Sequence, residues 1–354
     1  MARQPDPSAE RRRLQMADIA RLAGVSVSTV SRALNGSTLV NDETRQRVAE
    51  LARSLNYTIN ESAKNLRLQR NQTIAVVVPY DARSRQHISD PFFLSMVGSL
   101  ADALTDRGFD MLLSRVDAEA LDSVSALYDA GRAVGIVLIG QWRHHDQLNA
   151  LAARGVPIVV WGGQLPQQLY CTVGGDNELG GRLATEHLLA QGRRRILFLG
   201  DPQLPEVALR LAGHRQALGA AGVPFEGSRV CVVPFEEHDA ERAIAEQVVA
   251  ERVLAQPPAF DAVFACSDLI AILAMRALRS ASRRVPEDVA VVGYDNIAMA
   301  VYADPPLTTI HQPVSEAGVE LVDALMRLMA GEPQAPRVLP VRLVERQSSR
   351  PAAS

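Results

Sequence analysis

The sequence predicts a small all-α head followed by a larger α/β body made of two doubly wound parallel-sheet lobes. Two short helical patterns flank a tight turn near the start, and from Ile74 onward short β-branched runs alternate with amphipathic stretches of about a dozen residues or more. The chain has 354 residues, roughly two to three times the length of a typical domain. A single sheet with so many βα units would be very wide, so we expect two lobes.

Composition is that of an ordinary globular protein, with 47% hydrophobic and 22% charged residues, which argues against extensive disorder. The longest apolar runs are far shorter than the ~18 residues that span a bilayer, and residues 1–13 lack the apolar core of a signal peptide. Three cysteines stand far apart and indicate neither a disulfide framework nor a C-x-x-C metal site: Cys171, Cys231 and Cys266. We therefore expect a cytoplasmic protein with no membrane association.

Charge is distributed unevenly along the chain. Residues 1–70 contain 12 Lys and Arg against 7 Asp and Glu, a net charge of +5, which leaves 25 against 33, or −8, for the remainder. A basic head on an acidic body indicates that the head has a polyanionic partner.

The predicted head spans residues 15–58 and contains three helices. The first carries apolar residues three apart and ends at Gly24, and the second begins after Ser26, a good N-cap, and ends at Asn35-Gly36. The third begins at the Asn41 cap and buries residues at i, i+3 and i+7: Val48, Leu51 and Leu55. Before the head we expect a disordered basic extension over residues 1–14, whose Arg11–Arg13 either contacts a DNA backbone or is a solvated tail.

The predicted body spans residues 72–345 and is followed by a tail over residues 346–354. Its expected strands are Ile74–Val78, Met111–Ser114, Gly135–Ile139, Ile158–Trp161, Ile196–Gly200, Val230–Val233, Val263–Cys266, Ala290–Gly293 and a strand-like Val338–Val344. Its expected helices are Phe92–Arg107, Asp122–Ala130, Asp146–Ala153, Glu178–Gln191, Ala208–Ala221, Ala240–Leu254, Leu269–Ser280 and Val314–Met329.

The two helices around Ala23-Gly24-Val25-Ser26 have the geometry of a helix-turn-helix. An ordinary helical hairpin in a core is the alternative. The outer face of the second helix favours DNA, because its side chains are small and polar apart from the basic Arg32.

These residues resemble those of the LacI/GalR transcriptional regulators, and the likeness extends over nearly the whole chain. In the head it is carried by Ala17–Ala20, Gly24–Ser26, Thr29–Arg32, Leu34-Asn35, Val40 and Thr44-Arg45. In the body it continues through Asp90–Phe93, Gly175–Asn177, Arg210–Gly213, Val292–Asp295 and Pro305–Ile310. The resemblance implies a helix-turn-helix head and a body similar to periplasmic sugar-binding proteins.

By this resemblance, the second helix would read DNA. Base-reading positions would be Val27, Ser28 and Arg32, and positions near phosphates would be Thr29, Ser31 and Asn35. The chemistry of the first set agrees in part: an arginine can make a bidentate contact to guanine, a valine can contact only an apolar group such as a thymine methyl, and a serine is undiscriminating.

Residues 59–71 resemble the hinge helix and linker of the same family. The stretch from Asn60 to Leu66, with Lys64 inside it, is too polar and too short to hold a helix alone in water. In the family such helices pair across a dimer and insert a leucine into the minor groove, and Leu66 matches that position. Without the neighbouring helix-turn-helix, the residues from Asn60 to Leu66 would be interpreted as an ordinary linker.

The body is expected to bind a small effector, because ligands of open α/β sheets lie beyond the carboxyl ends of the strands. Carboxylates, a guanidinium and aromatic faces are what a polyol needs. The candidates are Asp90, Phe92, Trp161, Arg210, Ser267, Asp295 and Gln312. A structural ion pair or loop bond is the alternative for Asp295 and Arg210, and core packing is equally plausible for Trp161, which no family motif supports.

The sequence contains no recognisable catalytic constellation, so we expect neither an enzyme nor a cofactor or metal. His144-His145-Asp146 lacks the spacing of a metal site, and no G-x-S-x-G elbow is present. The sequence therefore predicts a repressor of sugar-utilisation genes. We expect it to bind a pseudo-palindromic double-stranded operator as a homodimer and to respond to a small carbohydrate. A sugar-binding protein or sugar-acting enzyme without a DNA role is the rival class, and a regulator whose effector is a partner protein is a third possibility.

Overall fold

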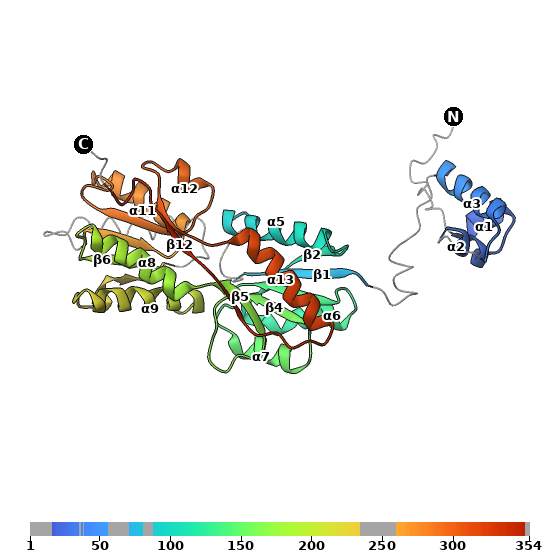
Figure 1. The fold of residues 1–354 in the computed structure, drawn as a ribbon, viewed down its shortest axis with the longest axis horizontal. Coiled ribbons are helices and arrows are strands. Elements are labelled where there is room, and N and C mark those ends of the chain that lie inside the picture. Colours follow the sequence, from blue (N-terminus) through green and yellow to red (C-terminus); the bar gives the residue numbers. More distant parts are fainter. Residues whose placement is uncertain are drawn as a thin grey trace, which may run out of the picture. The chain divides into compact units, whose positions relative to one another are not determined.

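The computed structural model describes residues 16–34, 37, 39–55, 71–80, 88–233 and 260–350. They belong to two compact units, a head and a body, that divide between Asn71 and Gln72 (Figure 1). Several sequence-based expectations lie outside the described residues: Asn35, Asn60, Lys64, Leu66 and the helix Ala240–Leu254.

The described head consists of α1 (Met16–Ala23), α2 (Val27–Leu34) and α3 (Asp42–Ser54) around a small apolar core. Gly24 takes a φ of +65°, which permits the tight turn between α1 and α2. The expected caps are confirmed: the Ser26 hydroxyl accepts the N–H of Thr29 at 3.1 Å, and the Asn41 side chain accepts the N–H of Thr44 at 2.8 Å. Val48 is fully buried on α3.

Lobe 1 is built on a six-stranded sheet, within the described residues, whose order is β11-β5-β4-β3-β1-β2 and whose neighbours all pair in parallel. Its strands are β1 (Thr73–Tyr80), β2 (Asp110–Asp117), β3 (Gly135–Ile139), β4 (Ile158–Trp161), β5 (Cys171–Gly175) and β11 (Arg337–Leu339). Its helices are α5 (Pro91–Thr105), the 3₁₀ turn η1 (Ala118–Val124), α6 (Ser125–Asp129), α7 (His145–Ala153) and α13 (Val314–Met329).

Lobe 2 is built on a second sheet, for which the described chain gives the order β12-β10-β9-β8-β6-β7. All neighbours are parallel except the edge strand β12, which runs antiparallel to β10. The strands are β6 (Ile196–Leu199), β7 (Val230–Cys231), β8 (Ala262–Ala265), β9 (Ala290–Asp295), β10 (Thr308–His311) and β12 (Arg342–Val344). The helices are α8 (Asn177–Ala190), α9 (Pro205–Ala220), η2 (Gly227–Arg229), α11 (Asp268–Ser280) and α12 (Met299–Tyr302). The two doubly wound lobes predicted from the sequence are thereby confirmed.

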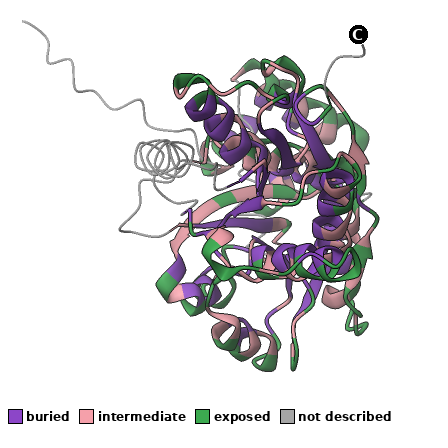
Figure 2. Cartoon of the chain, turned by 90° about the vertical axis from the view of Figure 1, so that its left-hand side faces the viewer, coloured by how far each residue is buried: buried purple, intermediate pink, exposed green. Residues whose placement is uncertain are grey.

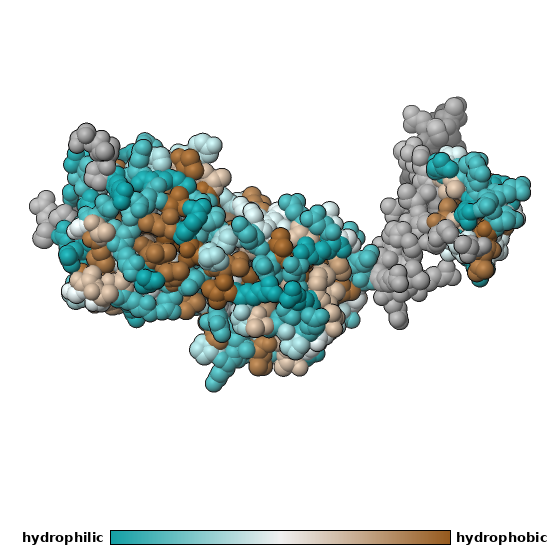
Figure 3. All heavy atoms as spheres, in the orientation of Figure 1, coloured by the Kyte–Doolittle hydropathy of each residue, from teal (hydrophilic) through white to brown (hydrophobic). Residues whose placement is uncertain are grey.

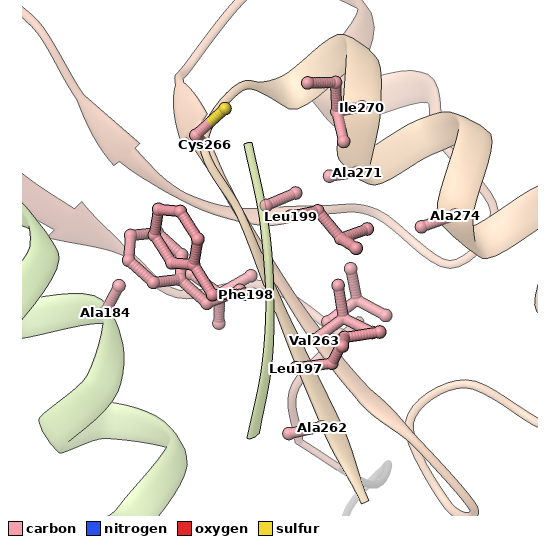
Figure 4. Packing of buried hydrophobic residues seen from close by; sticks show 14 of the residues in the cluster. Ala184, Leu197, Phe198, Leu199, Ala262, Val263, Cys266, Ile270, Ala271 and Ala274 are labelled. Atoms are coloured by element: carbon pink, nitrogen blue, oxygen red, sulfur yellow. The ribbon is translucent and has the colours of Figure 1, made fainter. Parts of the chain in front are cut away.

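Each sheet is covered by helices on both faces, so its central strands are buried, whereas edge strands such as β2 are partly exposed (Figure 2). In lobe 2 the central strands lie between α8, which carries Ala184, and α11, which carries Ile270 (Figure 4). Phe198 points toward α8 and Leu199 toward α11, as expected for successive residues of a strand. The face shown in Figure 3 carries both hydrophilic and apolar residues. None of the helices in the described ranges is long and apolar enough to cross a membrane.

The chain passes between the lobes at three places: from β5 to α8, from β10 to α13, and from β11 to β12. These crossings are neighbours. The N–H of Asp176 donates to the carbonyl of Leu339, and a Cβ on Gly175 would lie 2.9 Å from the Gln312 side chain and 3.0 Å from Val341. Gly175 therefore lets three segments, which are far apart in the sequence, pack at one hinge.

The structure differs from the sequence-based expectation at several strands. Strands β5 and β10 were not predicted, and the expected strand Val338–Val344 is two strands of different sheets, because the chain changes lobes at Pro340. The boundary expected at residue 345 is also too early. Ser348 and Ser349 are fully buried in lobe 2. There the N–H of Ser348 donates to the carbonyl of Pro306, and the carbonyl of Ser348 accepts the N–H of Val291.

Ser348 gives a test of this last contact. Its hydroxyl accepts the N–H of Thr308 at 2.8 Å and donates to the carbonyl of Val291 at 2.6 Å. Ser348→Ala removes both bonds inside the protein, so we expect a loss of ~1–3 kcal/mol in the free energy of unfolding. The loss should appear as a lower Tm of the body in calorimetry. The control is Ser280→Ala, whose exposed hydroxyl donates only to the carbonyl of Arg276; an equal Tm for the two variants would contradict the prediction.

Candidate functional site

Both lobes contribute to one cleft, which lies beyond the carboxyl ends of their strands. Six of the seven expected effector residues line it together: Asp90, Phe92, Trp161, Arg210, Ser267 and Asp295. The seventh, Gln312, is not among the lining residues. It lies at the hinge, where its Nε2 donates to Oδ1 of Asp295 at 2.7 Å, so its contact with the cleft is indirect.

Lobe 1 supplies an aromatic wall. Phe92 lies in the first turn of α5, where its ring centroid is 6.2 Å from that of Trp161 at the end of β4 and 5.8 Å from that of Phe93. Helix α5 begins there because Asp90 caps it, its Oδ1 accepting the N–H of Phe92 at 2.8 Å, and because Pro91 suits the first helical position. The cap holds a carboxylate beside the rings.

Lobe 2 supplies the guanidinium of Arg210, which is only 7% exposed. Nε donates to Oδ1 of Asn177 at 2.8 Å, Nη1 donates to the carbonyl of Cys266, and the guanidinium carbon lies 3.7 Å from the centroid of the Tyr294 ring. These contacts hold the planar group in place. Arginine has five N–H donors, so donors remain for a ligand.

Asp295 ends β9 in a strained conformation, with a φ of 110°, and Asn296 follows at 58°. Non-glycine residues rarely adopt positive φ, and such strain is concentrated at functional sites. Asp295 forms no ion pair with Arg210, because the bonds of the guanidinium go to Asn177 and Cys266. Between these two described residues the structural ion pair, one half of the alternative interpretation, is therefore absent. The other half, a loop bond, is present, because Arg210 donates to the carbonyl of Cys266 and Asp295 accepts from Gln312.

The cleft holds more acidic than basic side chains, because Glu206 joins Asp90 and Asp295 against Arg210. Burial raises the pKa of Glu206, and burial raises that of Asp295 well above its ordinary value, with Arg210 opposing and the charge of Asp90 adding to the rise. The site thus contains several hydrogen-bond acceptors, one fixed donor group and an aromatic wall. This combination suits a neutral ligand rich in hydroxyl groups.

Ser267 and Asp268 follow β8 at the start of α11. The Ser267 hydroxyl caps the helix by accepting the N–H of Ile270 at 3.3 Å and is 5% exposed at the cleft. Asp268 is buried beneath it, where burial raises its pKa to about 7 while bonds from Thr309 and from the N–H of Ile297 oppose the rise. Asp268 thereby ties the loop after Asp295 to the neighbouring strand.

Sequence reasoning missed two lining residues that matter, Trp142 and Glu206. Trp142 follows β3 and Glu206 stands in the first turn of α9, after β6, so both lie beyond the carboxyl ends of central strands. The rule that placed the other candidates could have found them.

The head presents a separate surface on α2. Val27, Ser28 and Arg32 are exposed, and Thr29 and Ser31 are half-buried. At the start of α2 the Ser26 hydroxyl lies 2.8 Å from the hydroxyls of both Ser28 and Thr29. A helix N-terminus bearing hydroxyls is suited to a phosphate, and an exposed arginine one turn beyond Ser28 is suited to a base edge.

Within the described ranges, no cluster of three or more His, Cys, Asp or Glu side chains is arranged to hold a metal ion. The potential ligand groups of the cleft are the carboxylates, the guanidinium and the hydroxyl already named.

Comparisons with known proteins agree with this division into head and body. Residues 15–60 match the family model for bacterial regulatory proteins of the lacI family, and residues 185–349 match the model for a periplasmic binding protein-like domain. The HTH-type transcriptional regulator CelR of Thermobifida fusca is 37% identical over 96% of this chain and 99% of its own.

Two solved structures are also similar over nearly the whole chain. A complex of the transcriptional regulator CelR with cellobiose has a TM-score of 0.70 and 34% identity, covering 95% of this chain and 100% of the other. A lac repressor dimer bound to operator and the anti-inducer ONPF has a TM-score of 0.82 and 27% identity, covering 96% and 99%.

The raised pKa of Asp295 predicts how the cleft affects stability. Because its folded pKa lies above the ordinary value of 3.8, the carboxyl contributes stability that is complete below about pH 3.8 and is lost as the pH rises through the folded pKa. Asn cannot ionise and still accepts the bond from Gln312. We therefore expect Asp295→Asn to have a higher Tm than the unaltered protein without ligand, with a gap that widens as the pH rises. Calorimetry across the pH range tests this, with the exposed Asp110→Asn as control; a constant gap would refute it.

Proposed function

The chain belongs to the LacI family of bacterial regulatory proteins, and on that premise we propose that it is a sequence-specific DNA-binding repressor of sugar-utilisation genes, controlled by a small carbohydrate in the cleft. The observation that carries the proposal is the presence, on one chain, of an exposed recognition helix and of a cleft that combines aromatic rings, carboxylates and a guanidinium. We place the protein in the cytoplasm, where its operator DNA is found.

The head acts on DNA through α2. Arg32 makes a bidentate contact to guanine, Val27 contacts an apolar group such as a thymine methyl, and Ser28 adds an undiscriminating bond. Thr29 and Ser31, half-buried beside them, contact phosphates and set the position of the helix on the duplex. One such helix reads too few base pairs, so the protein binds a pseudo-palindromic operator as a homodimer.

The cleft recognises the effector by hydrogen bonds and stacking. Asp90 and Asp295 accept hydroxyl hydrogens from opposite lobes, Arg210 donates, Ser267 adds a hydroxyl, and Phe92 and Trp161 cover an apolar face of the sugar ring. Gln312 orients Asp295 from the hinge. Cellobiose is the first effector to test, because the similar regulator CelR was solved in complex with it.

The DNA role is tested with Arg32→Ala on an operator selected from a random duplex pool. We expect a loss of ~1–3 kcal/mol in specific binding, a relaxed preference at one base position in each half-site, and little change in binding to unrelated duplex. Fluorescence anisotropy with both duplexes measures these. An equal loss on all sequences would make Arg32 a phosphate contact. Failure of the unaltered protein to select any sequence would favour a sugar-binding protein or enzyme without a DNA role.

The effector role is tested with Arg210→Lys, which keeps the charge and loses the planar fork. We expect the variant to bind operator normally without effector and to lose the cellobiose-dependent change in operator affinity, because a ligand that cannot bind cannot shift the equilibrium. Arg182→Lys, whose side chain pairs with Glu186 on the exposed face of α8, is the matched control. A full response of Arg210→Lys at unchanged cellobiose concentration would remove Arg210 from the site.

A further inference from the structure

A three-residue segment of lobe 1 reaches across to lobe 2 beside the cleft. This segment, Gln141–Arg143, follows β3, and we call it the strap. The N–H of Gln141 donates to the carboxylate of Glu206 at 3.3 Å, and the guanidinium of Arg143 pairs with the carboxylate of Asp201. Both acceptors lie in the chain that follows β6, so each contact joins one lobe to the other.

The base of the strap is fixed within lobe 1. The side chain of Gln141 is fully buried, its Nε2 donates to the carbonyl of Gly163 at 2.7 Å and to the Tyr170 hydroxyl at 3.0 Å, and its Oε1 accepts the N–H of Gly163 at 2.9 Å. A buried amide with several satisfied bonds is costly to displace. The strap therefore moves with lobe 1 and carries Trp142 and Arg143 at a defined position.

Trp142, in the middle of the strap, is strained. Its φ is 51°, a left-handed conformation that is unusual for a bulky residue, and its side chain lines the cleft. Strain of this kind persists only where the surroundings hold the residue on both sides. Here the residue before it is bonded to Gly163 and Glu206, and the residue after it is paired with Asp201.

The pair at the end of the strap is asymmetric. The Asp201 side chain is 5% exposed and that of Arg143 is 33% exposed, and Oδ1 of Asp201 also accepts the N–H of Gln203 at 2.9 Å. An ion pair with one largely buried partner contributes more than an exposed pair, and separating the lobes would break it. The pair therefore favours closed lobes.

We infer that Arg143 and Asp201 are positioning residues: their ion pair fastens the strap to lobe 2, keeps the cleft closed over Trp161, and fixes Trp142 as one of its walls. The effect on lobe closure is independent of any ligand. Its effect on effector affinity rests on the proposed function, because a cleft that is open for more of the time binds an enclosed ligand more weakly.

Tryptophan emission provides the measurement, because the chain contains two tryptophans and both line the cleft. Acrylamide quenching of the full-length protein without ligand then reports how open the cleft is. We expect Asp201→Asn and Arg143→Met each to raise the quenching constant roughly twofold or more, as closed lobes shield Trp161. The double variant should be no more accessible than either single variant, because all three break the same contact.

The matched control is Asp129→Asn, which breaks an arginine–aspartate pair of 2.8 Å with Arg154 inside lobe 1, where both side chains are about half exposed. It should leave quenching unchanged. Arg143→Met retains the turn bond that the N–H of Gln203 donates to Asp201, so this variant remains informative if Asp201→Asn destabilises the body. If the ion pair had a purely structural role, Asp201→Asn and Arg143→Met would lower the Tm without changing the quenching constant. An unchanged quenching constant in folded Arg143→Met overturns the inference.

Cellobiose titration of the same proteins by calorimetry gives a second readout. We expect a Kd about tenfold weaker for Arg143→Met, equivalent to about 1.4 kcal/mol, and an unchanged Kd for Asp129→Asn. An unchanged Kd for Arg143→Met would show that closure does not limit effector binding and would overturn that part of the inference. If the unaltered protein does not bind cellobiose, the proposed effector is wrong, while the quenching result still decides whether the ion pair keeps the lobes closed.

Discussion

The hinge where the chain changes lobes three times is the constraint on which the body depends. Gly175, Gln312 and Val341 belong to three separate crossings and lie against one another, with no room for a Cβ on the glycine. Three connections allow the lobes to open and close but restrict other relative motions. They also direct the carboxyl ends of both sheets toward one cleft, so that loops from distant parts of the chain meet around a ligand.

The cleft is adapted to binding at a cost in stability. Asp295 is held at a φ of 110° with a raised pKa, and Arg210 is held by neutral partners, Asn177 and Cys266, although a carboxylate is available nearby. A direct ion pair between them would satisfy both charges and leave less for a ligand. The structure instead keeps the charges apart, each oriented by neutral groups, which is the arrangement expected of a preorganised site.

Sequence patterns predicted most of the fold because hydrophobic periodicity is local. The strands that were missed are those in which local patterns mislead: β5 ends in two glycines, and β10 begins with two buried threonines. The packing of Ser348 and Ser349 depends on contacts with distant segments of lobe 2, and the split at Pro340 depends on β11 and β12 pairing in different sheets. Periodicity encodes neither. For the site, family motifs identified Arg210 and Asp295, but the roles of Trp142 and Arg143 arise from tertiary contacts with Gly163, Glu206 and Asp201 that no motif records.

The strap contributes to the free-energy difference between open and closed lobes before any ligand binds. A ligand can shift the equilibrium between open and closed lobes only by the difference between its affinities for the two arrangements. The Arg143–Asp201 pair favours closure before a ligand arrives, whereas burial of the Asp295 carboxyl group, which raises its pKa, opposes closure until hydrogen-bond donors reach that group. A ligand with hydroxyl groups supplies those donors and removes the opposition. Coupling between two binding sites is reciprocal. Where operator binding favours one lobe arrangement, the free-energy difference between open and closed lobes therefore also sets how strongly operator binding changes effector affinity. Residues outside the ligand's contacts can therefore adjust the response of the regulator without altering its specificity.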